Sequence, residues 1–464
     1  MKVALKILKW IAGALLGLII VIGVCWWLIP DEELNPDVRK FTDIASVPPA
    51  AKNAYFMIWG LVASPELDPH VVGQQIVAAH DRILAAEKDL SRFKVDAFYG
   101  EHKLTMPKDS KRFCDAEKEN CLLVYHAKRA QMLEQAEEKK LYLARYRKIR
   151  EYEDFSVAMS QTTFQTPVPA WLPILHMSDL VDGEIADRMK TKSTQKAALE
   201  ELDAEVSSWR RLLQSDDSLI TQMISVATLG RKYRLASEIM DAYPEVVAAH
   251  PALMTKITAP LSPAATNVIT SMGAEARFTI GTFASMETNR RFLADSFYDD
   301  LPGLPLRAAF AAGAFRPNAS TNDGFLIFKE AIDLFAKSPK QVLEGRAALV
   351  ARQEKLSRLT LGAVFYNPVG RITNATHPSD FTQYAFRIND IIGFSRLLEL
   401  KRRIIEGNIA LDKVAAVLAS SGAELMDPYT EKPMQWDAAT KRISFAIQGK
   451  RFPVFGYVTL DHFK

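Results

Sequence analysis

The sequence has few of the residues and none of the short motifs that usually signal metal sites, disulfide scaffolds or catalysis. It has 3 cysteines and 8 histidines in 464 residues, and the histidines form no HxH, HExxH or i,i+4 pair. GxSxG, Walker A and GxGxxG motifs do not occur either. These gaps exclude a disulfide-rich scaffold and leave no signal for a His-based metal site or a phosphate-binding loop. The sequence therefore predicts no catalytic, cofactor-binding or metal-ligating residue.

The chain also has little net charge of either sign. The chain has 58 Lys+Arg against 55 Asp+Glu, and Lys2, Lys6 and Lys9 supply the whole surplus because no acidic residue precedes Asp31. Nucleic-acid-binding proteins usually carry a basic footprint, so a neutral body predicts no nucleic-acid partner. With 48% hydrophobic and 24% charged residues, the composition is that of a folded globular protein.

One long hydrophobic run stands near the start of the chain. Residues 10–29 are twenty residues without a charge, and a helix of that length covers about 30 Å, the thickness of a hydrocarbon core. Lysines precede the run and acidic residues follow it, which predicts a cytoplasmic N-terminus and a body in the bacterial periplasm. Trp10, Trp26 and Trp27 lie at its two ends, where indole rings favour lipid headgroups. We therefore expect a single-pass inner-membrane protein that contacts the bilayer through residues 10–29.

A cleaved signal peptide is the alternative reading of this run. Signal peptides have an apolar core of about 7–15 residues, followed by small residues at the cleavage site. The run here is longer, and the segment around Cys25 (VCWWLIP) has no such site. These features favour an uncleaved anchor.

Cys114 and Cys121 are a disulfide candidate, because both follow the anchor and would face an oxidising compartment. If both lay in one helix, their Cα atoms would be about 10 Å apart, too far for a bridge. A disulfide therefore requires a turn between them and a helix that begins near Cys121. Two free thiols are the alternative. Neither cysteine has the CxxC spacing of a zinc site.

The patterns predict a mainly α fold with a small antiparallel β element at the C-terminus. We divide the chain into a cytoplasmic stub and anchor (1–30), a linker (31–50), a helical periplasmic body (51–425) and a β element (426–464). Helices are expected over residues 68–93, 121–150, 193–213, 216–243, 244–259, 264–298 with interruptions at Gly273 and Gly281, 325–335, 339–361, 381–406 and 411–419. Loops at 162–173 and 300–323 are candidate contact surfaces.

The last forty residues predict three short strands. Lys432–Trp436 and Ile443–Ile447 read as a hairpin, and residues 454–460 as a third strand. Three short strands cannot bury themselves alone, so we expect them to pack on the helix that ends at Glu406.

Three other patterns need an interpretation. Ser193-Thr194-Gln195-Lys196 matches the S-x-x-K motif of penicillin-binding proteins, but its partner motifs are missing and helix capping is the preferred reading. Residues 139–152 mix basic and aromatic side chains, which we interpret as the charged outer face of a helix. The buried stripe of the helix over 121–150 is expected to contain Leu123, Ala127, Ala130, Leu133, Leu141 and Ala144.

Several local motifs resemble an uncharacterised family of proteobacterial proteins with an N-terminal membrane anchor. They are Asn53-Ala54-Tyr55 with Gly60-Leu61, Asp68-Pro69 with Gly73, Cys114 with Cys121-Leu122, Leu143-Ala144-Arg145-Tyr146, Phe315-Arg316-Pro317-Asn318-Ala319 with Asn322, and Asn367-Pro368-Val369-Gly370. This resemblance implies the anchor and brings no activity.

Separately, the stretch DPYTEKPMQW (427–436) resembles the D-P-[FY]-[ST]-G-K-P hairpin of pseudopilin-like envelope proteins. Glu431 stands where that element usually has glycine. The resemblance implies a long helix followed by a hairpin.

Together these observations favour a binding or scaffold role in the cell envelope, with an envelope protein as the expected partner. An enzyme is the less favoured reading. A periplasmic hydrolase acting on peptidoglycan or peptides is the alternative, because a pair of catalytic carboxylates leaves no short motif.

Overall fold

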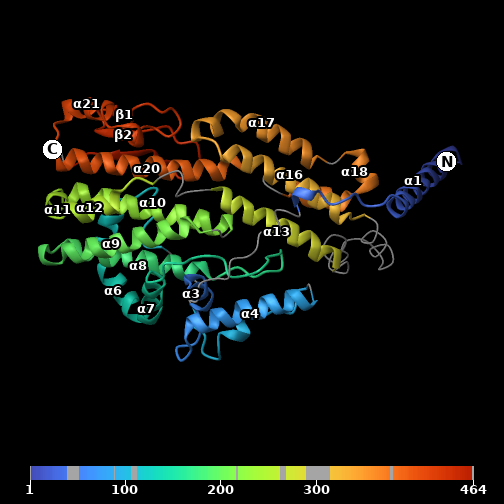
Figure 1. Ribbon diagram of the computed structural model, residues 1–464, viewed down its shortest axis with the longest axis horizontal. Helices are drawn as coiled ribbons and strands as arrows, with labels where there is room; N and C mark the ends of the chain where they lie inside the picture. Colours follow the sequence, from blue (N-terminus) through green and yellow to red (C-terminus); the bar gives the residue numbers. More distant parts are fainter. Residues whose placement is uncertain are drawn as a thin grey trace.

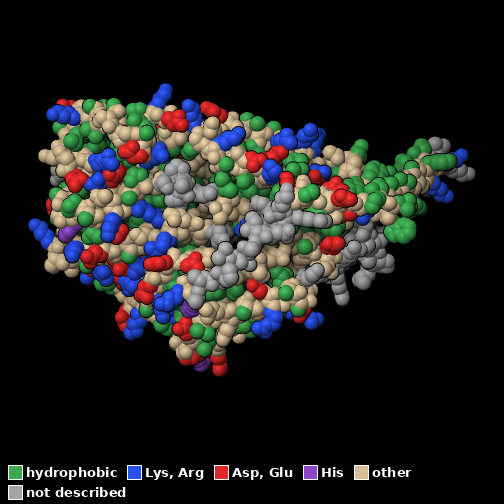
Figure 2. Space-filling view, viewed as in Figure 1, with side chains coloured by type: hydrophobic (Ala, Val, Ile, Leu, Met, Phe, Trp, Pro, Cys, Tyr) green, Lys and Arg blue, Asp and Glu red, His purple; other side chains and the backbone are tan. Residues whose placement is uncertain are grey.

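Helix α1 (Lys2–Leu28) projects from one end of an elongated helical body (Figure 1). The computed structural model describes residues 2–38, 52–87, 89–105, 112–215, 218–261, 268–288, 314–358, 360–376 and 380–461. Among these residues, the stretch Lys6–Leu28 of α1 is the one helix that is long and apolar enough to cross a membrane. Figure 2 shows this helix as an apolar rod with basic side chains near its free end.

The body is built from helices of very different lengths. Its N-terminal half contains α3 (Ala54–Gly60), α4 (Pro69–Glu87), η1 (Val95–Phe98), α5 (Cys121–Ala127), α6 (Arg129–Glu138), α7 (Lys140–Ile149), α8 (Trp171–Met189), α9 (Lys192–Leu213), α10 (Leu219–Ala242), α11 (Glu245–Ala249) and α12 (Pro251–Thr258). Its C-terminal half contains α13 (Val268–Thr288), α16 (Pro317–Phe335), α17 (Pro339–Ser357), α18 (Leu361–Tyr366), α19 (Pro368–Ala375), α20 (Thr382–Glu406), η3 (Leu411–Lys413), α21 (Val414–Ala419), η4 (Ala423–Leu425), β1 (Gln435–Asp437), β2 (Arg442–Ser444), η5 (Pro453–Gly456) and β3 (Tyr457–Thr459).

The two longest helices of the body, α10 and α20, pack against each other near its centre. The ring of Tyr233 on α10 meets the edge of Phe394 on α20, with 6.1 Å between ring centroids. Both side chains are fully buried, and they belong to one apolar cluster that extends from Ala54 to Leu460. Burial of this cluster is the main source of free energy for folding.

The C-terminal strands form the small antiparallel sheet that the sequence predicts, but each strand is shorter than predicted. Residues 432–434 and 445–447 lie outside β1 and β2, and residues 454–456 belong to η5 instead of the third strand. The order is β1-β2-β3, with Ile443 of β2 opposite Trp436 on one side and Val458 on the other. Ile443 and Val458 are fully buried. The sheet contacts α20, so the prediction that it packs on the helix ending at Glu406 is confirmed.

Two glycines let this C-terminal element lie directly on the helices. A Cβ atom at Gly393 of α20 would lie 2.3 Å from the ring of Phe445. A Cβ atom at Gly230 of α10 would lie 2.0 Å from the ring of Phe455. Both rings are buried, and neither could keep its place beside a larger residue.

The helix predicted over 121–150 is wrong in its continuity and in its buried face. The segment forms three helices, α5, α6 and α7, which meet at Lys128 and Lys139. The expected stripe is exposed, including Leu123 and Leu141. The buried side chains are instead larger, because aromatic and long aliphatic groups remove more apolar surface from water than alanine does. The buried apolar side chains are Cys121, Leu122, Tyr125, Met132, Tyr142, Leu143, Tyr146 and Ile149, and Lys139 and Arg145 are buried with them.

Other helix boundaries also differ from the sequence prediction. Helix α13 runs without a break through Gly273 and Gly281, so the predicted interruptions are wrong. A Cβ atom at Gly281 would lie 2.7 Å from the Thr162 carbonyl oxygen, so glycine at this position allows a neighbouring segment to pack closely on the helix. Helix α16 begins at Pro317, so the predicted loop is wrong over 317–323. The part of that loop at 300–313 lies outside the described residues. Helix α8 begins at Trp171, so the predicted loop at 162–173 is wrong over its last three residues, and the rest of α8 has no counterpart in the sequence prediction.

Candidate functional site

The most informative site is the junction between α1 and the body. Residues 29–38 do not lead away from α1 but lie across the N-terminus of α16. The Asp31 carboxylate accepts hydrogen bonds from the backbone amides of Asn318 (2.8 Å) and Ala319 (3.1 Å). The N-cap residue of α16, Arg316, makes no side-chain capping bond. Asp31 therefore caps α16, and its charge is favourably placed at the positive end of the helix.

Asn322, one turn further along α16, holds the same segment. Its side-chain oxygen accepts a hydrogen bond from the backbone amide of Asn35 (2.9 Å). Its side-chain nitrogen donates to a Glu32 carboxylate oxygen (2.8 Å) and to the Glu33 carbonyl oxygen (2.9 Å). At the end of this segment, Val38 is fully buried. The first part of the predicted linker 31–50 is thus attached to the body, and residues 39–50 lie outside the described ranges.

Arg316 binds the end of α1 itself. Its guanidinium donates hydrogen bonds to the carbonyl oxygens of Trp26 and Ile29, the latter at 2.6 Å. The last carbonyl groups of a helix have no partner within the helix, and a cation is favourable at this negative end. The same guanidinium lies over the ring of Tyr366, with 5.9 Å from its central carbon to the ring centroid. Arg316 therefore joins α1, α16 and α18.

Asn367 fixes the backbone from which Arg316 projects. Its side-chain oxygen accepts from the backbone amides of Arg316 (3.0 Å) and Gly370 (3.2 Å), and its nitrogen donates to Ser320 (3.0 Å). A Cβ atom at Gly370 would lie 1.8 Å from the Ser320 hydroxyl, so this contact requires glycine. Two of the motifs quoted for the family resemblance, around Arg316 and Asn367, are thus neighbours in space.

The three tryptophans predicted at the ends of the span have different surroundings. Trp26 is 7% exposed and packs in a small apolar cluster with Phe283, Phe315 and their neighbours. Trp10 and Trp27 are 76% and 86% exposed. We use the name anchor junction for residues 26–38 together with Arg316, Asn318, Ala319, Asn322, Tyr366 and Asn367.

A second polar site is buried between α8, α9 and α10. Lys232 of α10 lies 2.5 Å from Asp182 of α8 and 2.9 Å from Glu205 of α9, and all three side chains are at most 2% exposed. Beside them Arg231 pairs with Asp179. Burial raises the pKa of Asp182 to about 6, although Lys232 opposes this shift. These carboxylates are neutralised by fixed cations and enclosed by helices, so this arrangement is suited to holding helices together.

The basic and aromatic segment 139–152 supplies part of this buried site, and its interpretation as a charged outer face is wrong for its arginines. Arg145 is 5% exposed and donates to backbone carbonyl oxygens, including those of Leu61 and Ser64. Arg150 donates to Glu205 at 2.9 Å. The partners of these arginines come from distant parts of the chain, which the local pattern cannot reveal.

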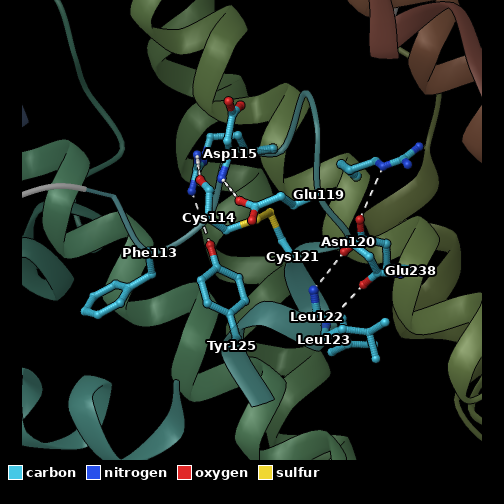
Figure 3. Close-up of a disulfide and its surroundings, with 12 residues drawn as sticks. Phe113, Cys114, Asp115, Glu119, Asn120, Cys121, Leu122, Leu123, Tyr125 and Glu238 are labelled. Carbon is cyan, nitrogen blue, oxygen red and sulfur yellow. Dashed lines mark hydrogen bonds and ion pairs between the residues drawn. A yellow bond between two sulfur atoms is a disulfide. The ribbon is translucent and has the colours of Figure 1, made fainter. Parts of the chain in front are cut away.

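Figure 3 shows the Cys114–Cys121 pair, whose sulfur atoms lie 2.06 Å apart, at disulfide distance. Their Cα atoms are 5.5 Å apart across a turn, and α5 begins at Cys121, as the sequence predicts. The amide of Phe113 donates to Asp179 (2.7 Å) and the amide of Leu122 donates to Glu238 (2.9 Å). The disulfide therefore secures a turn that is bonded to α8 and α10. Cys25 is a free cysteine.

The remaining chemical candidates are not assembled into a site. Ser193 and Lys196 are exposed on α9, and Lys196 pairs with Glu200 at 3.5 Å. The N-cap position of α9 is Thr191, which makes no side-chain capping bond, so the predicted capping role of Ser193 or Thr194 is wrong. Within the described ranges, no group of three or more His, Cys, Asp or Glu side chains is arranged to hold a metal.

A surface cavity of about 450 Å³ lies between α6, α7 and the segment before residue 106. It is lined by Lys103, Leu104, Thr105, Glu138, Lys139, Leu141 and Tyr142. These residues include one carboxylate, and a glycosidase-type mechanism needs two.

Comparison of the chain with known protein families, with characterised proteins and with solved structures gives no significant match.

Proposed function

We propose that this chain is a single-pass inner-membrane protein whose periplasmic helical body has a binding or scaffold role in the cell envelope. The observation that carries the proposal is the anchor junction. An apolar helix of membrane-spanning length is attached to the body by hydrogen bonds from Arg316, Asn318 and Asn322. A body attached in this way holds one orientation to the membrane, which a flexible tether would not impose.

Charge at the two ends of α1 supports the orientation. Lys2, Lys6 and Lys9 precede the span, and Asp31 and Glu32 follow it. Lysines are enriched on the cytoplasmic side of a span, which supports a body on the other side of the membrane. The Cys114–Cys121 disulfide fits that side, because disulfides persist in the oxidising periplasm.

The chemistry of the body favours binding over catalysis. The facing carboxylates of Asp182 and Glu205 share Lys232 and are closed off from solvent. A hydrolase acting on peptidoglycan or peptides needs carboxylates that a substrate and a water molecule can reach. The hydrolase alternative therefore has less support than a binding role.

Two experiments on the full chain test this proposal. Alkaline phosphatase fused after Lys464 should be active, because its disulfides form in the periplasm. Green fluorescent protein fused at the same place should be dark, because the fusion point would lie outside the cytoplasm. The protein should stay in the membrane fraction after carbonate washing. A fluorescent cytoplasmic fusion, or release of a chain that begins after Pro30, would refute the topology.

The binding role is tested by crosslinking in intact cells, followed by mild detergent extraction. We expect a discrete crosslinked species that contains a second envelope protein. Recovery of the monomer alone, under conditions that crosslink known envelope complexes in the same cells, would contradict the binding role.

A further inference from the structure

The length of α1 that is free of the body is too short for a whole bilayer. The described side chains from Lys6 to Val21 are exposed, and Ile22 is the first that packs against the body. At 1.5 Å per residue, the stretch from Lys9 to Ile22 covers about 20 Å. A hydrocarbon core is about 30 Å thick. If α1 spans a membrane, as proposed above, the part of the body beside its last two turns lies at the depth of the lipids.

That part of the body presents unusual apolar side chains. Helix α18 contacts α1, and its first residue, Leu361, is 80% exposed. On the adjoining helix α19, Ile372 is 45% exposed. Figure 1 shows α18 next to the base of α1, at the end of the body from which α1 projects. An exposed leucine is common on a protein surface, but here Leu361 belongs to a helix that contacts α1, which is itself apolar all round. Ile372 belongs to α19, which contacts α18.

Two of the charged groups at this end are paired within the protein, and the exposed residues include Glu32, Glu33 and Asp37. The Arg316 guanidinium is occupied by the carbonyl oxygens at the end of α1, and Asp31 is occupied by the amides of α16. Lys355 and Arg358, near the end of α17, are exposed and precede Leu361 by a few residues. Long basic side chains can reach lipid phosphates while the residues next to them enter the apolar region.

We propose that α18 and Ile372 of α19 form a lipid-binding edge, inserted into the outer leaflet of the membrane that α1 spans. The occupant of this apolar surface is the bilayer itself, at the boundary between acyl chains and headgroups. The inference rests on the proposed function, because it needs α1 in the membrane. It adds a second membrane contact, made by the body, which would fix the tilt of the body.

The test uses the full chain in vesicles of phosphatidylethanolamine and phosphatidylglycerol. Cys25→Ala removes the free thiol, and single nitroxide labels are placed at Leu15→Cys in α1, at Leu361→Cys, or at Leu172→Cys. Leu172 is the matched control, because it is 78% exposed on α8. Oxygen concentrates in hydrocarbon and a nickel chelate stays in water, so the ratio of their collision rates reports depth. All three positions are exposed, and circular dichroism checks that each labelled chain is folded.

We expect the oxygen-to-nickel ratio at residue 361 to be several-fold above that at residue 172 and closer to that at residue 15. A high ratio at residue 15 with equal, low ratios at 361 and 172 would overturn the lipid-binding edge and leave the anchor intact. A low ratio at residue 15 would instead overturn the anchor, and with it the proposed function.

Discussion

The Asp31 carboxylate accepts a hydrogen bond from the Asn318 backbone amide at 2.8 Å, although the two residues are 287 positions apart in the sequence. Through this bond a residue that follows the apolar helix caps a helix of the body. The contact makes α1 and the body one unit, and a change at Asp31 tests it.

Asp31→Ala should loosen the first turn of α16. Loss of a capping side chain costs about 1 kcal/mol, and the charge at the helix N-terminus adds to that. We expect hydrogen exchange at the Asn318 and Ala319 amides to become about tenfold faster, which corresponds to 1.4 kcal/mol. Glu33→Gln is the control, because Glu33 bonds Asn322 through its backbone carbonyl group. Unchanged exchange in Asp31→Ala would mean that the cap contributes nothing.

The buried pairs of Lys232 predict a large loss of stability in Lys232→Met. The substitution leaves Asp182 and Glu205 buried next to an apolar side chain, and breaking a buried ion pair costs about 3–5 kcal/mol. Urea unfolding of the full chain in detergent measures this cost. The matched control is Lys196→Met, whose side chain is 67% exposed and for which we expect a change below about 0.5 kcal/mol. Similar values for the two variants would refute a structural role of the buried site.

Asp390 makes a pH-dependent contribution that can be isolated. It accepts from the Tyr429 hydroxyl (2.7 Å) and the Gly449 amide (2.8 Å), and burial raises its pKa from 3.8 to about 6. Between pH 4 and pH 6, the Asp390 carboxyl group therefore keeps its proton in the folded protein and has lost it in the unfolded chain. Stability contributed by this group is greatest below pH 4, falls as the pH rises to about 6, and is constant above it.

Asp390→Asn removes this titration. The free energy of unfolding of the wild type minus that of the variant should fall by up to about 3 kcal/mol between pH 4 and pH 6. Urea unfolding at several pH values gives the difference directly. A difference that rises over this range would show that the pKa of Asp390 is lowered instead.

The backbone at Glu431 predicts a stabilising substitution. Its φ of 57° is in the left-handed region, which costs an L-residue about 1–2 kcal/mol. Glu431→Gly removes this cost, but the more flexible unfolded chain lowers the free energy of unfolding by about 0.5–1 kcal/mol. We expect a net gain of up to about 1 kcal/mol in thermal or urea unfolding. The neighbouring Lys432 is not among the non-glycine residues with positive φ, so Lys432→Gly should destabilise. A loss of stability in both variants would contradict the argument.

The helices that the sequence predicts well are those with one apolar face and clear ends. Helix α20 ends at Glu406 before Gly407, as predicted, and α10 begins at Leu219, within three residues of its predicted start at 216. The C-terminal strands were predicted for the same reason, since the buried Ile443 and Val458 alternate with partly exposed neighbours. In these elements local pattern and tertiary environment agree.

Helix α8 was not predicted, although its buried apolar side chains recur at helical spacing: Trp171, Ile174, Met177, Val181, Ile185 and Met189. The Thr- and Pro-rich stretch before it favours a loop, and Pro173 lies in its first turn, where proline is tolerated. The same helix also buries Asp179, Asp182 and His176. Their partners lie on α10 and α6, far away in sequence. The same holds for Arg145 and Arg150, whose charge suggests solvent but whose partners are buried.

The anchor junction was visible only as separate motifs. The sequence contains Arg316, Asn322 and Asn367, but no local rule shows that they meet the end of α1. The missing cap of α16 is supplied by Asp31, and a helix end completed from so far away leaves no signature in a short window. The long apolar helix itself was predictable, because twenty consecutive apolar residues can be recognised without knowledge of any partner.

The distance between α1 and the body tests the central claim most directly. Nitroxide labels at Leu15→Cys and Leu172→Cys, in a Cys25→Ala chain reconstituted in vesicles, report this distance by pulsed electron paramagnetic resonance. The anchor junction predicts one narrow distance distribution, which broadens when Arg316→Ala and Asn322→Ala are introduced together. A broad distance distribution in the protein with an unaltered junction would show that a flexible tether joins α1 to the body, and it would contradict the account.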